Sequence, residues 1–198
     1  MRVAAIGFQA VLLVVASRAV AQHGGGPIGP AAVAPAEARQ HDFLVGQWDL
    51  TVKVPATSLA TRIHGMPKLV GTWKAWRAFD GYGIQDELRI TDASGNPMNL
   101  THSLRYYDRT ARQWTITALD AYRGKVVTST ATWADGAMSQ EAKGVDQEGK
   151  AFLSRARFTD ITPSSFTFRQ DRSYDEGKSW KEGTLVIEAK RVAATAPR

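Results

Sequence analysis

The sequence predicts an all-β protein: an antiparallel up-and-down (meander) β-barrel of about 8–10 strands, with a short helix before the first strand. Strand-like segments recur along the 198-residue chain, separated by turn residues roughly every 10 to 15 positions. The loops between them are short, so consecutive strands are expected to be antiparallel neighbours. A meander this long exposes two edges unless it closes, and closure gives a barrel whose interior can hold one small ligand.

The expected elements follow one another in a simple order. The short helix is expected over Ala36–Leu44. Ten strands then follow at Gln47–Val54, Gly71–Phe79, Ile84–Thr91, Asn99–Tyr107, Gln113–Ala121, Lys125–Trp133, Met138–Val145, Ala151–Thr159, Ser165–Tyr174 and Lys181–Lys190. Asp135-Gly136 is a strong signal for a two-residue hairpin. Longer turns are expected at Asp92–Pro97, Asp146–Gly149 and Asp175–Lys178, where Asp, Asn, Ser and Gly favour turn conformations.

The two ends of the chain do not read as parts of the barrel. Arg2, an almost wholly apolar run over Val3–Ala16 and the small residues Ala19-Val20-Ala21 together resemble a secretory signal peptide over residues 1–21. Cleavage is expected after Ala21, which predicts a periplasmic or secreted protein. Residues 22–35 are rich in Gly, Pro and Ala and are expected to be a flexible linker. The barrel domain is predicted over 36–192, followed by a disordered tail over 193–198.

Composition excludes several kinds of function. The chain has no cysteine, which rules out disulfides, a thiol nucleophile and cysteine metal sites. The net charge is +6, but no three basic residues are consecutive, so a nucleic-acid partner is not expected. No phosphate loop, dinucleotide fingerprint or serine-hydrolase motif occurs, and no cofactor or catalytic residue is assigned. Apart from the leader, no apolar run is long enough to span a membrane.

No metal site is expected either. The four histidines share no spacing typical of metal ligands. They are His23, His41, His64 and His102.

One carboxylate is expected inside the barrel. Asp86 and Glu87 are adjacent on a strand and therefore point to opposite faces, so one of them should face inward. An inward carboxylate must be paired or protonated, and its candidate neighbours on other strands are Arg77, Arg105, Arg172 and Asp120. Such a group could anchor a ligand, act as an acid or base, or form a structural ion-pair ladder.

The two strands after Asp86 supply the other candidate ligand-binding residues. Ser103 and Arg105 share one face of their strand, and Trp114, Ile116 and Asp120 share one face of the next. If both faces point inward, Arg105 lies near Ile116 or Asp120. The predicted ligand site, with the inward Arg172 of a later strand, comprises Asp86, Ser103, Arg105, Trp114, Ile116, Asp120 and Arg172. Trp73 and Trp76 lie three apart, so only one of them can face the interior.

Four segments carry a resemblance to a known family. Gly46-Gln47-Trp48 resembles the opening motif of the lipocalins and wider calycins. With it come Phe79–Glu87, then Ser103–Asp108 with Gln113-Trp114, then Ser173–Trp180. In this order the segments are similar to the DUF1579-type family of bacterial exported, calycin-like proteins of unknown function, over roughly His41–Arg191. The resemblance implies a lipocalin-like barrel in which Trp48 plugs the closed end and a basic residue of the last strand, Arg191 or Lys190, packs over it.

The leading functional expectation is an exported barrel that binds a small apolar or amphipathic molecule. The first alternative is a hydrolase or isomerase that uses an Asp86/Arg105/Asp120 cluster in the cavity, because barrels of this kind also host enzymes. The second is an interaction module whose barrel is filled by side chains. The volume of the interior separates a binding barrel from a filled one. The sequence leaves the ligand and the oligomeric state open.

Overall fold

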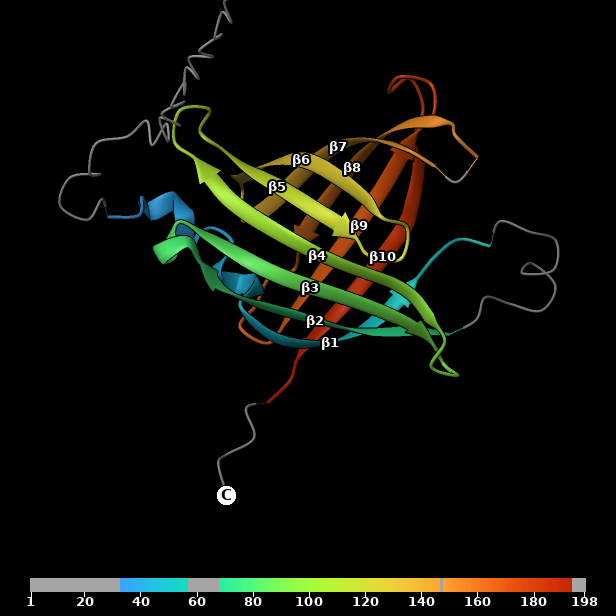
Figure 1. The fold of residues 1–198 in the computed structure, drawn as a ribbon, viewed down its shortest axis with the longest axis horizontal. Helices are drawn as coiled ribbons and strands as arrows, with labels where there is room; N and C mark the ends of the chain where they lie inside the picture. The colour runs from blue at the N-terminus through green and yellow to red at the C-terminus, as the bar shows by residue number, and fades with distance from the viewer. Residues whose placement is uncertain (1–32, 57–67, 147, 194–198) are drawn as a thin grey trace, which may run out of the picture. The chain divides into compact units, whose positions relative to one another are not determined.

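The computed structural model shows a closed antiparallel β-barrel of ten strands (Figure 1). It describes residues 33–56, 68–146 and 148–193. Each strand pairs with its neighbours in the chain, and β1 closes the ring by pairing with β10. The predicted up-and-down barrel is therefore confirmed. The expected signal peptide lies outside the described residues, as do most of the expected linker and tail.

The strands match the predicted segments closely. They are β1 (Gly46–Lys53), β2 (Leu69–Ala78), β3 (Gly83–Asp92), β4 (Pro97–Asp108), β5 (Gln113–Asp120), β6 (Lys125–Ala134), β7 (Ala137–Val145), β8 (Ala151–Thr159), β9 (Ser165–Ser173) and β10 (Lys181–Arg191). The expected N-terminal helix takes the form of two 3₁₀ turns, η1 (Ala36–Arg39) and η2 (Asp42–Leu44). A third turn, η3 (Phe79–Gly81), joins β2 to β3.

Turn chemistry explains why the chain reverses where it does. Asp135 and Gly136 both have positive φ, 51° and 72°, as a two-residue hairpin between β6 and β7 requires. The Asp92 carboxylate accepts backbone hydrogen bonds from Ser94 and Asn96, both at 2.9 Å, in the β3–β4 turn. Such Asp-centred turns hold the next strand antiparallel to the previous one.

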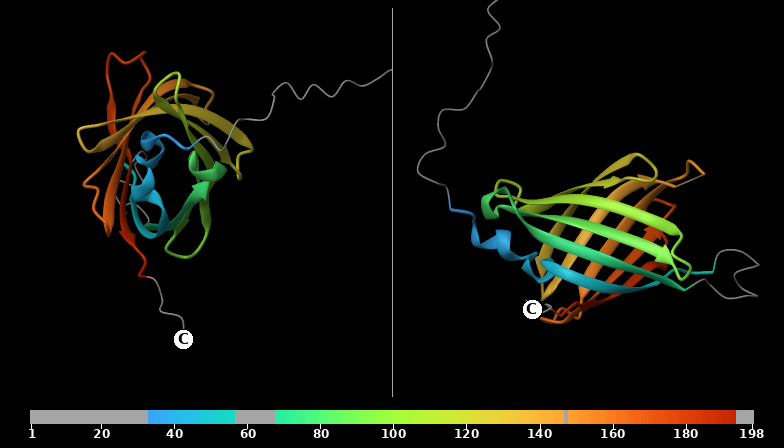
Figure 2. Two further views of the ribbon diagram at one scale, coloured as in Figure 1. Left: turned by 90° about the vertical axis from the view of Figure 1, so that its left-hand side faces the viewer. Right: turned by 60° about the horizontal axis from the view of Figure 1, so that its bottom comes forward.

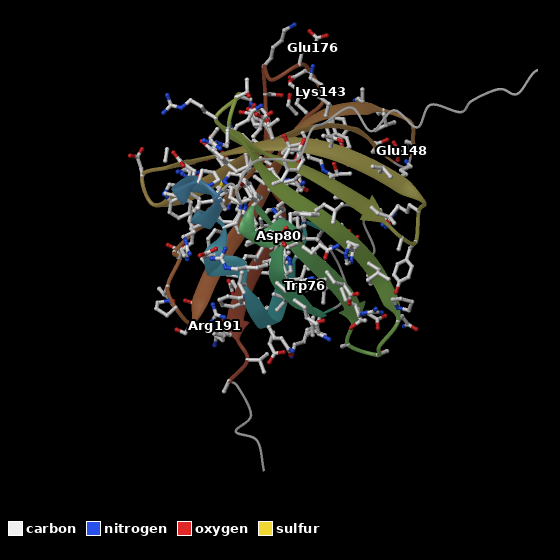
Figure 3. All side chains as sticks on the ribbon, turned by 60° about the vertical axis from the view of Figure 1, so that its left-hand side comes forward. Trp76, Asp80, Lys143, Glu148, Glu176 and Arg191 are labelled. Atoms are coloured by element: carbon white, nitrogen blue, oxygen red, sulfur yellow. The ribbon has the colours of Figure 1, made fainter. Side chains whose placement is uncertain are left out.

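Side chains alternate between the interior and the outside along each strand. In β1 the burial follows this period, with Trp48, Leu50 and Val52 buried. In β2 the Trp73 side chain is 3% exposed, whereas Trp76 is 41% exposed on the outside (Figure 3). Only one of the two tryptophans therefore faces the interior, as predicted.

The barrel has two unlike ends. At the closed end, β1 begins, β10 ends, and η2 and η3 lie close by (Figure 2). This half is filled by a core whose largest fully buried side chains include Trp48, Trp114, Phe158, Leu44, Ile84, Ile116, Met138 and Ile187. At the open end lie the turns β3–β4, β5–β6, β7–β8 and β9–β10. The barrel is thus packed at one end, and any interior space must lie toward the other.

Candidate functional site

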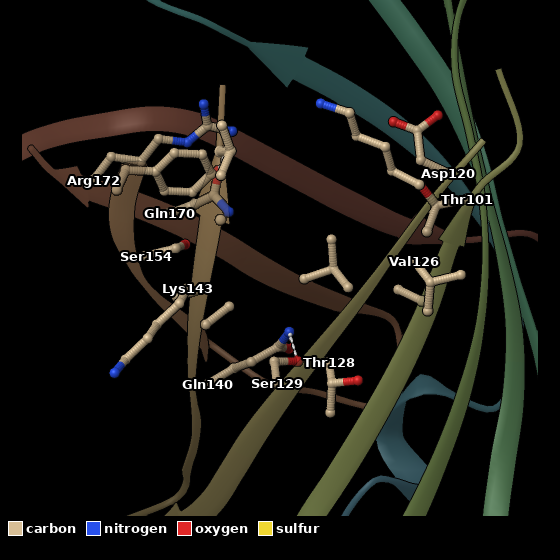
Figure 4. Close-up of a pocket in the computed structure, with 18 of the residues that line it drawn as sticks. Thr101, Asp120, Val126, Thr128, Ser129, Gln140, Lys143, Ser154, Gln170 and Arg172 are labelled. Carbon is tan, nitrogen blue, oxygen red and sulfur yellow. Dashed lines mark hydrogen bonds between the residues drawn. The ribbon is translucent and has the colours of Figure 1, made fainter. Parts of the chain in front are cut away.

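A cavity of about 680 Å³ occupies the open half of the barrel (Figure 4). Its walls come from six consecutive strands, β4 to β9. The lining residues are Thr101, Ala118, Asp120, Lys125, Val126, Val127, Thr128, Ser129, Gln140, Ala142, Lys143, Gly144, Val145, Phe152, Ser154, Ala156, Phe168, Gln170 and Arg172. This volume lies within the range of about 300–1,000 Å³ that is usual for small-molecule sites. The barrel is therefore not filled by its own side chains.

Strand register explains why this half is hollow. Gln140 of β7 lies opposite Ala156 of β8, which lies opposite Gln170 of β9. The neighbouring row joins Ala142, Ser154 and Arg172 in the same way. Alternate positions on these strands face the interior, and here they carry alanine, serine and flexible polar side chains in place of large aromatic rings. The interior is consequently left open.

The cavity combines apolar walls with a few polar groups. Phe168 and Ala156 form its inner wall, next to the core, since the Phe168 and Phe158 rings are 4.9 Å apart. Gln140 Nε2 donates a hydrogen bond of 2.9 Å to Ser129 Oγ, which orients both side chains (Figure 4). Apolar walls with a small number of placed polar groups are typical of binding sites for small molecules.

Arg172 places a guanidinium group in the wall of this cavity, near the end of β9. Its guanidinium carbon lies 4.4 Å from the centre of the Phe152 ring. Its Nη2 atom makes a long contact of 3.5 Å with Gln170 Oε1, and its buried Nε has no hydrogen-bond partner within the described part of the chain. Among the described residues, no carboxylate lies within ion-pair distance of Arg172. A positively charged group is therefore held in the wall without a counter-charge.

The rim above the cavity is predominantly basic. A second hollow of about 710 Å³ shares Asp120, Lys125, Phe152 and Arg172 with the first. Its charged lining residues are Arg123, Lys125, Lys150, Arg172 and Lys181 against Asp120, Asp146 and Glu148. Asp120 is already paired with Arg123 at 2.8 Å. The described part of the rim therefore favours an anionic ligand.

Five of the predicted ligand-binding residues do not line this cavity. Asp86, Ser103, Arg105, Trp114 and Ile116 all face inward but are buried toward the closed end. Of the predicted set, only Asp120 and Arg172 line the cavity. Reasoning from the sequence missed Ser129, Gln140, Phe152, Ser154, Phe168 and Gln170. The inward rows of β7, β8 and β9 carried the signal, because they hold small and polar residues where a filled barrel needs large ones.

Asp86 and Arg105 form a buried ion pair. Arg105 Nε donates to Asp86 Oδ2 at 2.5 Å, and Nη2 lies 3.3 Å from Asp86 Oδ1. Trp73 Nε1 donates to the same Oδ1 atom at 2.8 Å. The carboxylate is thus held by donors from two residues, Arg105 and Trp73. The ring centres of Trp73 and Phe158 lie 5.9 and 6.0 Å from the guanidinium carbon. This arrangement fits the structural alternative for an inward carboxylate.

The expected Asp86/Arg105/Asp120 cluster is not assembled. Arg105 lies opposite Ile116 of β5, and Asp120 is four residues further along that strand, about 13 Å away at the usual rise. Asp120 pairs with Arg123 in the β5–β6 turn, at the open end. Arg172 is also not a neighbour of Asp86, since it lines the cavity. Of the two neighbours expected for Arg105, Ile116 is therefore confirmed and Asp120 is wrong.

The closed end has the arrangement that the resemblance implied for Trp48 and a basic residue of the last strand. Trp48 is fully buried, and its Nε1 donates to the Leu44 carbonyl at 2.8 Å. The Arg191 guanidinium lies 4.0 Å from the centre of the Trp48 ring. Arg191 also donates to the carbonyls of Val45, Phe43 and Pro163. It therefore ties the end of β10 to the segment before β1 and to the β8–β9 turn.

His41 is a buried titratable residue that the sequence did not single out. Its side chain is fully buried, its ring centre lies 4.4 Å from that of Trp114, and neither ring nitrogen has a hydrogen-bond partner among the described residues. Burial, and then the nearby positive charge of Arg105, hold the pKa of His41 well below its usual value. The imidazole is therefore neutral in the folded protein near neutral pH. The spacing of the histidines in the sequence did not predict that His41 is buried.

Fold and site together define the class: a closed antiparallel β-barrel with a packed end and a ligand-sized cavity at the other end. Comparison with protein-family models and with curated proteins finds no match. Among the described residues, no three His, Cys, Asp or Glu side chains are grouped to hold a metal ion. Within the same ranges, no helix has the length and apolar character to cross a membrane.

Proposed function

We propose that this protein is an exported binding protein of the DUF1579-type, calycin-like kind, which takes a small, mainly apolar molecule into the open half of its barrel. The observation that carries the proposal is the cavity of about 680 Å³ between β4 and β9. Export and family membership rest on the sequence features of the leader and of the four resembling segments.

The chemistry of the walls supports binding more than catalysis. Asp86 and Arg105, on which the hydrolase or isomerase alternative relied, form an ion pair with each other and are buried away from the cavity. The cavity itself offers amide, hydroxyl, ammonium and guanidinium groups around apolar walls, and the Asp120 carboxylate in its lining is already paired with Arg123. Such groups orient a ligand without supplying an acid and base pair.

The test uses an uncharged apolar fluorophore, N-phenylnaphthylamine, whose emission rises in a dry site. We expect saturable binding to the purified protein, and we expect Ala142→Leu to weaken it by filling the cavity with extra methyl groups. Ala134→Leu, at an exposed alanine next to the β6–β7 turn at the closed end, is the matched control and should leave binding unchanged. Failure to bind, or equal effects of the two variants, would count against the proposal.

Native mass spectrometry of the purified protein gives an independent readout. A co-purified small molecule that Ala142→Leu displaces and Ala134→Leu retains would identify the natural ligand directly.

A further inference from the structure

Arg172 carries an unmet requirement for an anion. A guanidinium stays charged at all physiological pH values, and a partly buried one needs a carboxylate, a phosphate or a comparable group. Arg172 is only partly exposed, and among the residues that the structure describes its buried Nε has no partner. Among these residues its polar contact is the long one with the neutral Gln170 amide.

The residues around Arg172 also favour an anionic ligand. The centre of the Phe152 ring lies 4.4 Å from the guanidinium carbon of Arg172, and the ring centres of Phe152 and Tyr174 are 6.0 Å apart. The ammonium groups of Lys150 and Lys181 lie 5.0 and 5.1 Å from the Tyr174 ring. Aromatic rings thus hold three cations at one side of the rim without neutralising them.

Two of the three carboxylates in the described rim, those of Asp120 and Asp146, are bound by other groups. Asp120 pairs with Arg123. Asp146 accepts backbone hydrogen bonds from Glu148 and Lys150 in its own turn, each at 2.9 Å. Within the described ranges, neither these two carboxylates nor that of Glu148 is in ion-pair contact with Arg172, so the positive charge at this wall is available to a ligand.

We infer that the ligand is an amphipathic anion: an apolar body with one carboxylate or similar acidic group, bound with that group at Arg172. The polar group sits near the rim, where β9 ends, and the apolar body extends inward toward Phe168 and Ala156. Phe168 is four residues from Arg172 on the same face, about 13 Å deeper. Because the site is the cavity described above, the inference rests on the proposed function and adds the charge and orientation of the ligand.

Two probes with the same tail separate the two ideas. Dodecanoic acid and dodecanol differ only in the head group, and isothermal titration calorimetry below their aggregation limits measures both. We expect the acid to bind at least about tenfold more tightly, the lower bound for a charge-assisted hydrogen bond. Equal affinity of acid and alcohol would overturn the inference while leaving the proposed function intact. Failure of both to bind would refute the proposed function itself.

Variants then assign the preference to Arg172. Arg172→Met should bring the affinity for the acid down to that for the alcohol while leaving the alcohol unaffected within about twofold. Arg157→Met is the matched control: it removes one positive charge from an exposed position of β8 that does not line the cavity, so the preference should persist. If the acid preference survives in Arg172→Met, or is lost equally in Arg157→Met, the assignment fails.

A conservative variant guards against misfolding. Arg172→Gln keeps a polar side chain of similar reach, and circular dichroism checks that each variant retains its β-sheet signal. Should Arg172→Met fail to fold, Arg172→Gln provides the same comparison, and the acid–alcohol difference of the unmodified protein decides the ligand class without any variant.

Discussion

The Asp86–Arg105 pair predicts a strong and specific coupling inside the closed end of the barrel. Both side chains are almost fully buried, at 1% and 5% exposed, so each charge depends on the other. Asp86→Asn removes the negative charge but keeps an oxygen that can accept the Trp73 hydrogen bond. Breaking a buried pair leaves an uncompensated charge and costs about 3–5 kcal/mol. Arg105→Met leaves the opposite charge alone and should cost a similar amount.

The double variant distinguishes a charge effect from a packing effect. With both charges gone, no buried ion is left unpaired, so Asp86→Asn/Arg105→Met should be no less stable than either single variant. That result corresponds to a coupling free energy of about 3 kcal/mol. Urea denaturation followed by tryptophan fluorescence measures all four proteins. Losses that add to within about 0.5 kcal/mol would show that the two groups do not interact, and would refute the reasoning.

Three further predictions concern the closed end. Trp48→Ala should lower the free energy of unfolding by about 3–5 kcal/mol, because the ring is fully buried; a loss below about 1 kcal/mol in chemical denaturation would contradict its place in the core. His41 has a lowered pKa in the folded state, so the unfolded chain binds a proton first on acidification. The stability that neutral His41 contributes is therefore fully present above about pH 6.5. Below that pH, the free energy of unfolding decreases by up to about 1.4 kcal/mol per pH unit. His41→Phe should therefore flatten the pH dependence of unfolding between about pH 6.5 and 5.5, and an unchanged slope would count against this. Gly46→Ala should destabilise more than Gly95→Ala in thermal denaturation: both have positive φ, but a Cβ at Gly46 would lie 2.3 Å from Arg191 Nη1, whereas none would touch at Gly95. Equal losses would mean that this contact is unimportant.

Much of the fold was predictable because its signals are local. Asp135-Gly136 specifies a hairpin by its own conformational preference, and it forms one. Alternation along a strand decides which side a residue faces, which is why Trp73 and Trp76 were separated correctly. Both features depend on residues within a few positions of each other.

The candidate site was harder because depth along the barrel is not a local property. Ser103, Arg105 and Ile116 do face inward, but alternation does not say whether an inward residue reaches the packed end or the hollow end. The depth of a residue depends on how strands distant in sequence are staggered around the barrel and on which inward rows carry aromatic side chains. Arg172 was identified as inward-facing, but its position beside Phe152 depends on the pairing of β8 with β9.

The seam between β1 and β10 has a consequence for how the chain folds. Trp48 pairs with Arg191, so the ring is completed by contacts between the two extremes of the domain. Contacts of such large sequence separation form late, because the chain must first lose the entropy of a very long loop. Before β10 docks, β1 and β9 present unpaired backbone edges, at which one chain can pair with another copy. We therefore expect aggregation during refolding to compete at this seam, and to increase when the Arg191 contacts that fasten it are removed.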